Sequence, residues 1–326
     1  MTAVTVRVPA KLNLQLAVGP VRPDGFHELV TVFHAISLHD EVTVREADRR
    51  RVTVTGEGAA AVPHGDDNLA LQAVTALARA AGLPPRRVPR VVSETSGPPA
   101  AAGPGVAIEI RKRIPVAAGL AGGSADAAAA LVACNELWRA GLSQQELAEV
   151  AAGIGSDVAF ALVGGTSVGQ GRGERLTPAL VTGQYHWVLA FATGGLSTAD
   201  VYRACDRIRA ARDIIAAPPR LNNELMSALR SGDPAEVGPL LGNELQPAAV
   251  SLRPELRRTL AVGREYGALG TIVSGSGPTC AFLVADAHQA VDLVVALTGA
   301  GVCRSAVRAV GPAQGAVVVS PSELMT

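Results

Sequence analysis

A glycine-rich run between a predicted strand and a predicted helix constrains this chain most. Residues 106–111 alternate as in a strand, residues 115–126 read PVAAGLAGGSAD, and an alanine-rich helix predicted over 124–140 ends at Gly141. Glycines at a helix start let a ligand approach the backbone, and the helix N-terminus offers unpaired N–H groups and a partial positive charge. The run therefore favours a phosphate-binding loop, although it is neither a Walker A loop nor G-x-G-x-x-G. The alternative is a plain glycine-rich turn with Ser124 as an ordinary N-cap.

Length, charge and cysteines exclude several classes of protein. The 326 residues suggest about two domains, and 48% hydrophobic residues exclude a disordered chain. Equal numbers of basic and acidic residues, 29 each, give no attraction to nucleic acid or to an anionic membrane, and no apolar stretch reaches a membrane span. Scattered histidines and cysteines argue against a metal cluster and predict a reducing, cytoplasmic location. A monomer and a homodimer both remain open. The four cysteines are Cys134, Cys205, Cys280 and Cys303.

Only two of the 29 basic residues are lysines, Lys11 and Lys112. Surface positions tolerate replacement of lysine by arginine, whereas a site that needs a compact ammonium does not. Both lysines are therefore candidate site residues, with chance survival as the alternative.

The chain predicts an α+β protein of two domains, residues 1–183 and 184–326, with a proline-rich surface insertion at 84–104. Strands are predicted at 4–8, 41–45, 51–55, 106–111, 186–192 and 302–310, a hairpin at 165–177, and two strands joined by a turn within 271–284. Helices are predicted at 68–82 (opened by Asp67), 124–140, 143–153, 198–212, 222–231, 253–266 and from about 286. In the second domain, the order strand, helices, paired strands, helix, strand is that of a ferredoxin-like unit.

Three motifs, in order along the chain, resemble those of the GHMP kinases. PVAAGLAGGSADAA is similar to their second motif, P-x-x-x-G-L-G-G-G-S-S. Residues 9–14, PAKLNL, resemble the first motif, and residues 273–280, VSGSGPTC, the third. The resemblance implies a two-domain α+β fold, with a ribosomal-S5-like N-terminal domain before the ferredoxin-like one. It also implies phosphoryl transfer from ATP with Mg²⁺.

The resemblance assigns the ATP-binding residues. Mg²⁺ is expected to be held mainly through ATP, with the hydroxyl of Ser124 as a further candidate ligand. Asp126 and Glu174 are candidate carboxylates on the magnesium side, and ordinary helix-start or surface charge is the alternative for each. Ala121 departs from the family glycine, so the backbone there must accept a Cβ. The expected ATP contacts are Pro115, Val116, Ala117, Ala118, Gly119, Leu120, Ala121, Gly122, Gly123, Ser124 and Ala125, together with Lys112, whose alternative is a solvated charge at a strand end.

Lys11 and Asp157 match the family's catalytic pair, with Asp157 in the block GSDVAFAL. A carboxylate within reach of the acceptor hydroxyl can take its proton, and an adjacent ammonium keeps the carboxylate ionised. The alternative for Asp157, capping of a helix after Gly155, is compatible with this role.

The block RPDGFHEL at residues 22–29 resembles R-x-D-G-Y-H of the GHMP kinases that phosphorylate 4-diphosphocytidyl-2-C-methyl-D-erythritol. Phe26 replaces the usual tyrosine and keeps an aromatic face for cytosine, and His27 can recognise the edge of the base. The expected substrate-binding residues are Asn13, Phe26, His27, Thr198, Tyr202, Gly275, Ser276 and Gly277. The alternatives are a homoserine-type or mevalonate-type kinase, an inactive binding protein of the same fold, and a nucleic-acid-binding protein of S5-like ancestry. Homoserine and mevalonate have no base to stack, which argues against the first alternative. The intact pair Lys11 and Asp157 argues against an inactive protein, and the zero net charge argues against nucleic-acid binding.

Overall fold

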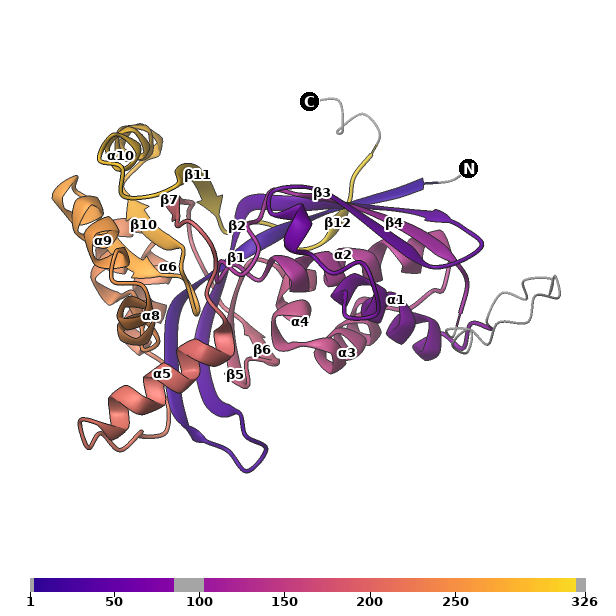
Figure 1. Ribbon diagram of the computed structural model, residues 1–326, viewed down its shortest axis with the longest axis horizontal. Coiled ribbons are helices and arrows are strands. Elements are labelled where there is room, and N and C mark those ends of the chain that lie inside the picture. The colour runs from indigo at the N-terminus through magenta and orange to yellow at the C-terminus, as the bar shows by residue number, and fades with distance from the viewer. Residues whose placement is uncertain (1–2, 85–102, 321–326) are drawn as a thin grey trace.

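The molecule has two halves, each built around one β-sheet, and a long antiparallel hairpin joins them (Figure 1). The computed structural model describes residues 3–84 and 103–320. Strand β1 (Ala3–Val21) pairs with β2 (His27–Glu46) along nearly its whole length, and Figure 1 shows the hairpin running from the first half into the second. Side chains on this hairpin can therefore reach a site that both halves build.

The predicted strands at 4–8 and 41–45 are correct in place but too short. The middle of β1 is buried at almost every position. A strand that is covered on both faces shows no alternation of apolar and polar residues, so the periodicity does not reveal it.

The first sheet has the strand order β12-β1-β2-β4-β3, and β5 and β8 pair with β2 and β1 respectively. The helices α1 to α4 lie on one face of this sheet (Figure 1), and α2 packs against β1 and β2. The bounds are β3 (Arg51–Gly56), β4 (Val106–Lys112), β5 (Thr166–Gly171), β6 (Arg175–Pro178), β8 (Gly242–Asn243), β12 (Val317–Val318), α1 (Leu69–Ala80), α2 (Gly122–Leu137), α3 (Gln144–Ile154), α4 (Ser156–Val163) and a short 3-10 helix η1 (Ala59–Ala61).

Two of the predicted helix starts differ from the structure. Asn68, and not Asp67, caps α1, because its side chain accepts a hydrogen bond from the backbone of Ala70. Helix α2 begins at Gly122, two residues early, and no side chain caps it, so Ser124 is not its N-cap. The helix predicted at 143–153 is confirmed as α3, which opens with a capping box of Ser143 and Glu146, whereas α4 was not predicted.

The second sheet has the antiparallel order β11-β7-β10-β9, which is the 4-1-3-2 order of a ferredoxin-like unit. The expected topology is confirmed. The strands are β7 (Tyr185–Phe191), β9 (Gly270–Val273), β10 (Cys280–Val284) and β11 (Ser305–Gly311). The helices are α5 (Thr198–Ala210), α6 (Asn223–Ser231), α7 (Pro234–Val237), α8 (Gln246–Leu252), α9 (Leu256–Glu265), α10 (Ala287–Gly299) and the 3-10 helix η2 (Gly238–Leu240).

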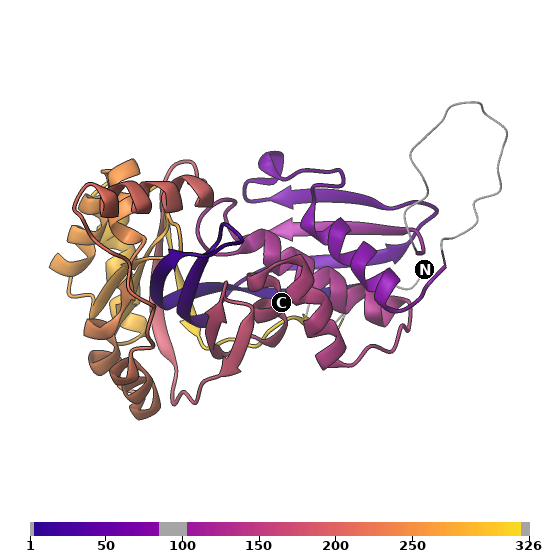
Figure 2. The same cartoon turned by 90° about the horizontal axis from the view of Figure 1, so that it is seen from below.

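The two sheets are connected at more than one place. After β11 the chain returns to the first sheet, where β12 pairs with β1 (Figure 2). The backbone N–H of Val310 also donates to the hydroxyl of Ser37, at 2.9 Å. A boundary at residue 183 stays a prediction, and most of the insertion predicted at 84–104 lies outside the described residues. Within residues 3–84 and 103–320, no helix is long and apolar enough to cross a membrane.

Candidate active site

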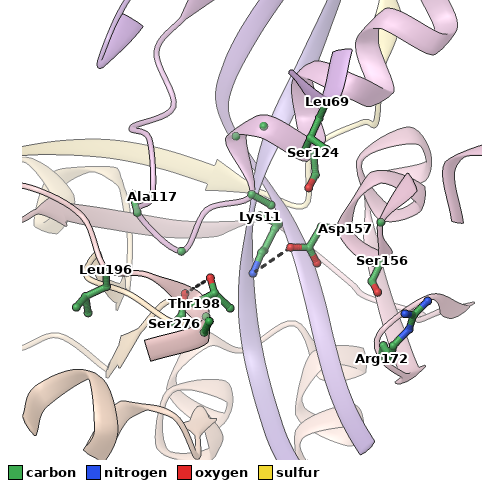
Figure 3. A pocket seen from close by; sticks show the side chains of 18 of the residues that line it. Lys11, Leu69, Ala117, Ser124, Ser156, Asp157, Arg172, Leu196, Thr198 and Ser276 are labelled. Carbon is green, nitrogen blue, oxygen red and sulfur yellow. Dashed lines mark hydrogen bonds and ion pairs between the residues drawn. The ribbon is translucent and has the colours of Figure 1, made fainter. Parts of the chain in front are cut away.

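A cavity of about 1210 Å³ lies where β1, the glycine-rich run, the start of α4 and the second half of the chain meet. All three motifs contribute to its wall (Figure 3). Nearly all of the predicted site residues line it. Of that set, Leu120, Ala125, Gly277 and Glu174 do not. Leu120 and Ala125 are buried in the core, and Gly277 supports the loop from behind.

The glycine-rich loop is fixed through its carbonyl groups by the first and third motifs and by Leu196. Four consecutive carbonyls, from Ala117 to Leu120, accept hydrogen bonds from elsewhere in the chain. Their donors are, in order, Leu196 N (3.1 Å), Thr279 N (3.3 Å), Ser274 Oγ (3.0 Å) and Lys11 N (3.3 Å). The loop is therefore held in shape by protein contacts before any ligand binds, which lowers the cost of ordering it around one.

Glycine is required at one position of this loop, Gly119. Its φ of 78° lies in the left-handed region, and a Cβ there would collide with the carbonyl oxygen of Ser274. Ala117 and Ala121 are also left-handed, with φ values of 52° and 58°. The departure from glycine at Ala121 is therefore accommodated, at a cost of about 1 kcal/mol in backbone strain.

Lys11 lies on the cavity floor beside Asp157. Its Nζ donates to Asn13 Oδ1 at 2.6 Å and lies 4.0 Å from Asp157 Oδ2, as Figure 3 shows for the ion pair. Burial lowers the pKa of Lys11, and the carboxylate of Asp157 offsets only part of that effect. The 32% exposed side chain of Asp157 leaves its carboxylate open to the cavity.

The amide of Asn13 is oriented by its neighbours on the hairpin. Its Nδ2 donates to Thr31 Oγ1 at 2.7 Å, and that hydroxyl donates to the carbonyl of Gln15 at 2.7 Å. The amide oxygen of Asn13 therefore points to Lys11 and accepts a hydrogen bond from its ammonium group. Direct contact of Asn13 with a substrate stays a prediction.

Lys112 lies under the loop in a buried ion cluster. Its Nζ is 2.5 Å from Asp40 Oδ2 and 2.7 Å from Asp126 Oδ2. Burial lowers the pKa of Lys112, but the two carboxylates together outweigh it and raise the pKa above the ordinary value. Asp40 also accepts the backbone N–H groups of Arg113 (2.5 Å) and Ile114 (2.9 Å). The cluster thus ties the end of β4 to α2, which frame the loop.

The far end of the cavity carries aromatic side chains. The rings of His27 and Tyr202 lie 4.9 Å apart at 31°, and His27 Nε2 is 2.9 Å from Asp206 Oδ1. Phe26 is 53% exposed, and the guanidinium of Arg172 lies 4.8 Å from its ring centre. This end can hold a planar ring between aromatic faces.

The second half closes this wall through Thr198 and Ser276, whose hydroxyl oxygens are 3.0 Å apart. Gly275 lies beside them with φ of 53°, and a Cβ there would lie 3.1 Å from Lys11 Nζ. The third motif therefore approaches Lys11 at backbone level, as its glycines allow.

This chain is similar to known proteins both in sequence and in fold. The profile of the GHMP kinases N terminal domain matches residues 68–165, and that of the GHMP kinases C terminal matches residues 225–303. The 4-diphosphocytidyl-2-C-methyl-D-erythritol kinase of Mycolicibacterium gilvum is 54% identical over 98% of this chain and 94% of its own length. The enzyme of the same name from Nocardia farcinica is 53% identical, over 98% and 97%. The chain belongs to this family of GHMP kinases.

Solved structures agree with that assignment. A crystal structure of 4-(cytidine 5'-diphospho)-2C-methyl-D-erythritol kinase is 31% identical, with a TM-score of 0.71 over 94% of this chain and 98% of that one. A homoserine kinase from Cytophaga hutchinsonii has a TM-score of 0.70 at 19% identity, which shows the shared fold alone. The two-domain α+β fold of the GHMP kinases is thus confirmed, and the protein is an ATP-dependent kinase.

The structure of this kinase brings in three site residues that the sequence did not reveal: Asp40, Arg172 and Asp206. Asp40 is 72 residues from Lys112, and Asp206 is 179 residues from His27, so no local spacing links the partners. Arg172 lies in the turn of the hairpin that the sequence predicts at 165–177, and the strand pattern there singles out no side chain.

The two candidate magnesium carboxylates are already engaged in this kinase. Glu174 accepts the backbone N–H of Arg172 at 2.6 Å and does not line the cavity. Asp126 is paired with Lys112, and burial raises its pKa well above the ordinary value. In the part of the chain that the structure describes, no group of three or more His, Cys, Asp or Glu residues could hold a metal ion.

Proposed function

We propose that this kinase transfers the γ-phosphoryl group of ATP to the 2-hydroxyl of 4-(cytidine 5'-diphospho)-2-C-methyl-D-erythritol, a step of the non-mevalonate isoprenoid pathway. The observation that carries the proposal is the order of groups along one cavity. The backbone N–H of Lys11 donates to Leu120 of the glycine-rich loop, and Lys11 pairs with Asp157. The charge of Asp157 acts on Tyr202, whose ring packs against His27, and Phe26 lines the same cavity. That order matches a donor phosphate, an acceptor hydroxyl and a nucleoside base.

We assign the proton of the acceptor hydroxyl to Asp157. Its carboxylate faces the cavity and can accept this proton as the new phosphorus–oxygen bond forms. Lys11 keeps that carboxylate ionised and provides positive charge where negative charge develops. Asn13 holds the ammonium in place from below, through the 2.6 Å hydrogen bond.

The donor side is the loop and the start of α2. The first N–H groups of α2, beginning at Gly122, have no partner within the helix and suit phosphate oxygens. Asp126, the nearby carboxylate, is paired with Lys112 and is therefore not free to hold a metal ion by itself. The hydroxyl of Ser124 lines the cavity and can complete the coordination of a magnesium ion that enters with ATP. When bound with ATP, Mg²⁺ neutralises charge on the transferred group.

The acceptor side is the aromatic end. We propose that cytosine stacks against Phe26 and Tyr202 while His27, oriented by Asp206, bonds to its edge. Thr198 and Ser276 close the wall beside the ribose and diphosphate. Base stacking on an aromatic ring is worth about 1–3 kcal/mol.

The test is a comparison of acceptors by ATP consumption. We expect the cytidyl compound to be preferred strongly over 2-C-methyl-D-erythritol 4-phosphate, with homoserine and mevalonate inactive, and ³¹P NMR to show a new phosphomonoester on the 2-hydroxyl. Phe26→Ala is expected to lower kcat/KM for the cytidyl compound about ten- to a hundredfold and to narrow the preference. Phe26→Tyr is the matched control and is expected to behave as wild type. Equal rates on both erythritol compounds would exclude the cytidine assignment.

We further propose a cytoplasmic location, which the four free cysteines support, since a reducing compartment keeps thiols unpaired. Limited proteolysis can test the predicted domain boundary at residue 183. Light scattering can distinguish a monomer from a homodimer.

A further inference from the structure

Arg172 is placed in the wall of the cavity by a turn with little conformational freedom. It lies between β5 and β6, flanked by Gly171 and Gly173, whose φ values of 77° and 102° favour glycine. Its backbone N–H donates to Glu174 Oε2 at 2.6 Å. A Cβ on Gly173 would lie 3.3 Å from the ring of Phe33 and 3.5 Å from Ser156, so the turn packs closely against the start of α4.

The guanidinium of Arg172 reaches the cavity between two parts of the site. It lies 4.8 Å from the ring centre of Phe26, at the aromatic end. Figure 3 shows its side chain beside Ser156, the residue before Asp157. Arg172 is therefore in contact with one of the proposed base-binding side chains and lies next to the start of α4, which carries Asp157 (Figure 3).

The charge of Arg172 is not neutralised by the protein. Among the residues that the structure describes, no carboxylate pairs with its guanidinium, which makes it unusual among the cations that line the cavity. The others have these partners: Lys11 with Asp157, Lys112 with Asp40 and Asp126, and Arg203 with Asp200. A planar guanidinium that is fixed on one side by a ring, and free on the other, is suited to bind phosphate oxygens in a bidentate manner.

We infer that Arg172 binds the diphosphate of the acceptor substrate and so determines its preference for a nucleoside diphosphate. The inference rests on the proposed function. In that substrate two anionic phosphates separate the base from the polyol. Arg172 contacts Phe26 and lies beside Ser156, the residue before Asp157, so it can reach a group bound between the two (Figure 3). Arg172 thereby adds a charge-based criterion to the stacking of the base, and a polyol that lacks the nucleotide satisfies neither.

The first test is steady-state kinetics of Arg172→Gln, with Arg175→Gln as the matched control. Arg175 lies on the same hairpin, is 67% exposed, has Glu28 at 3.8 Å and does not line the cavity. Arg172→Gln is expected to raise KM for the cytidyl substrate about tenfold or more, because charge-assisted hydrogen bonds are lost. KM for ATP and the melting temperature are expected to stay at wild-type values, as is every parameter of Arg175→Gln. Arg172→Lys is expected to restore the affinity in part, since it keeps the charge without the planar fork.

The second test separates diphosphate binding from support of the ring of Phe26. Cytidine, CMP and CDP are titrated calorimetrically with the ATP site saturated by a non-hydrolysable ATP analogue. The inference predicts that Arg172→Gln weakens CDP about tenfold, CMP less, and cytidine not at all. Equal weakening of all three would mean that Arg172 only supports Phe26, and weakening of ATP alone would place it on the donor side; either result overturns the inference, as does no change. If wild type itself fails to bind CDP, the proposed function fails and the inference with it, whereas normal CDP binding by Arg172→Gln overturns the inference alone.

Discussion

The two lysines of this chain lie in the same cavity wall, and both are buried beside carboxylates, yet their surroundings differ. Lys11 has one carboxylate at 4.0 Å and a neutral amide at 2.6 Å. Lys112 has two carboxylates, at 2.5 and 2.7 Å. As a result the pKa of Lys11 is lowered by burial, whereas the pKa of Lys112 is raised by its two partners despite burial.

The difference separates a cation that is available for chemistry from one that holds the structure. The charge of Lys112 is already compensated, so it can do little for an incoming phosphate. The charge of Lys11 is only partly compensated, and its ammonium can respond to charge that develops on the transferred group. The two also act oppositely on stability against pH. Lys112 stabilises the folded state below pH 10.5, and this stabilisation is lost as the pH rises through its raised pKa. Lys11 destabilises the folded state when it is charged, and this loss of stability is recovered as the pH rises from its lowered pKa toward 10.5.

The largest effect is expected at the Lys11 site. Asp157→Ala removes the carboxylate that we assign to the acceptor proton, and kcat is expected to fall at least ~100-fold while ATP binding stays nearly unchanged. Lys11→Arg is also expected to be damaging, because a planar fork does not replace a compact ammonium. Steady-state kinetics and ATP titration check both variants. Near-normal turnover in either would remove that residue from the chemistry.

At the Lys112 site the expected effect is on folding. Lys112→Met leaves Asp40 and Asp126 buried without a cation, and the free energy of unfolding is expected to fall by about 3–5 kcal/mol. Urea denaturation of this variant and of Lys11→Met makes the comparison. If Lys112→Met were as stable as wild type while losing only ATP affinity, Lys112 would be a ligand-binding cation like Lys11.

A smaller effect is expected when the surroundings of Lys11 are made similar to those of Lys112. Asn13→Asp places a second carboxylate next to Lys11, which makes its surroundings resemble those of Lys112. The pKa of Lys11 is expected to rise and kcat to fall by about tenfold, because the added negative charge offsets the ammonium. The shape of the side chain is preserved, so the melting temperature serves as the control. A kcat equal to wild type would show that the charge of Lys11 does not assist transfer.

The sequence predicted the parts of the site that local patterns carry. The loop, the positions of Lys11 and Asp157, and the aromatic pair at Phe26 and His27 follow from motifs that each span a few residues. The low lysine content also singled out both lysines. It could not distinguish their roles, because the partner that matters most to Lys112, Asp40, is 72 residues away and has no local pattern of its own.

The remaining differences have the same cause. The predicted strands in β1 and β2 were too short because contacts on both faces remove the alternation. Helix α4 was not predicted, since at eight residues it is too short for a clear period and depends on packing against α2 and α3. The contact of Lys112 with ATP stays a prediction, whereas its two carboxylate partners, Asp40 on β2 and Asp126 on α2, were not foreseen.

The most direct test of this account is an NMR titration of the two lysine ammonium groups. With lysine as the only ¹⁵N-labelled residue, the protein gives two Nζ signals, which Lys11→Met assigns. We expect Lys11 to titrate below the ordinary pKa of 10.5 and Lys112 above it. Titration of both groups at one pH, or in the reverse order, would contradict it.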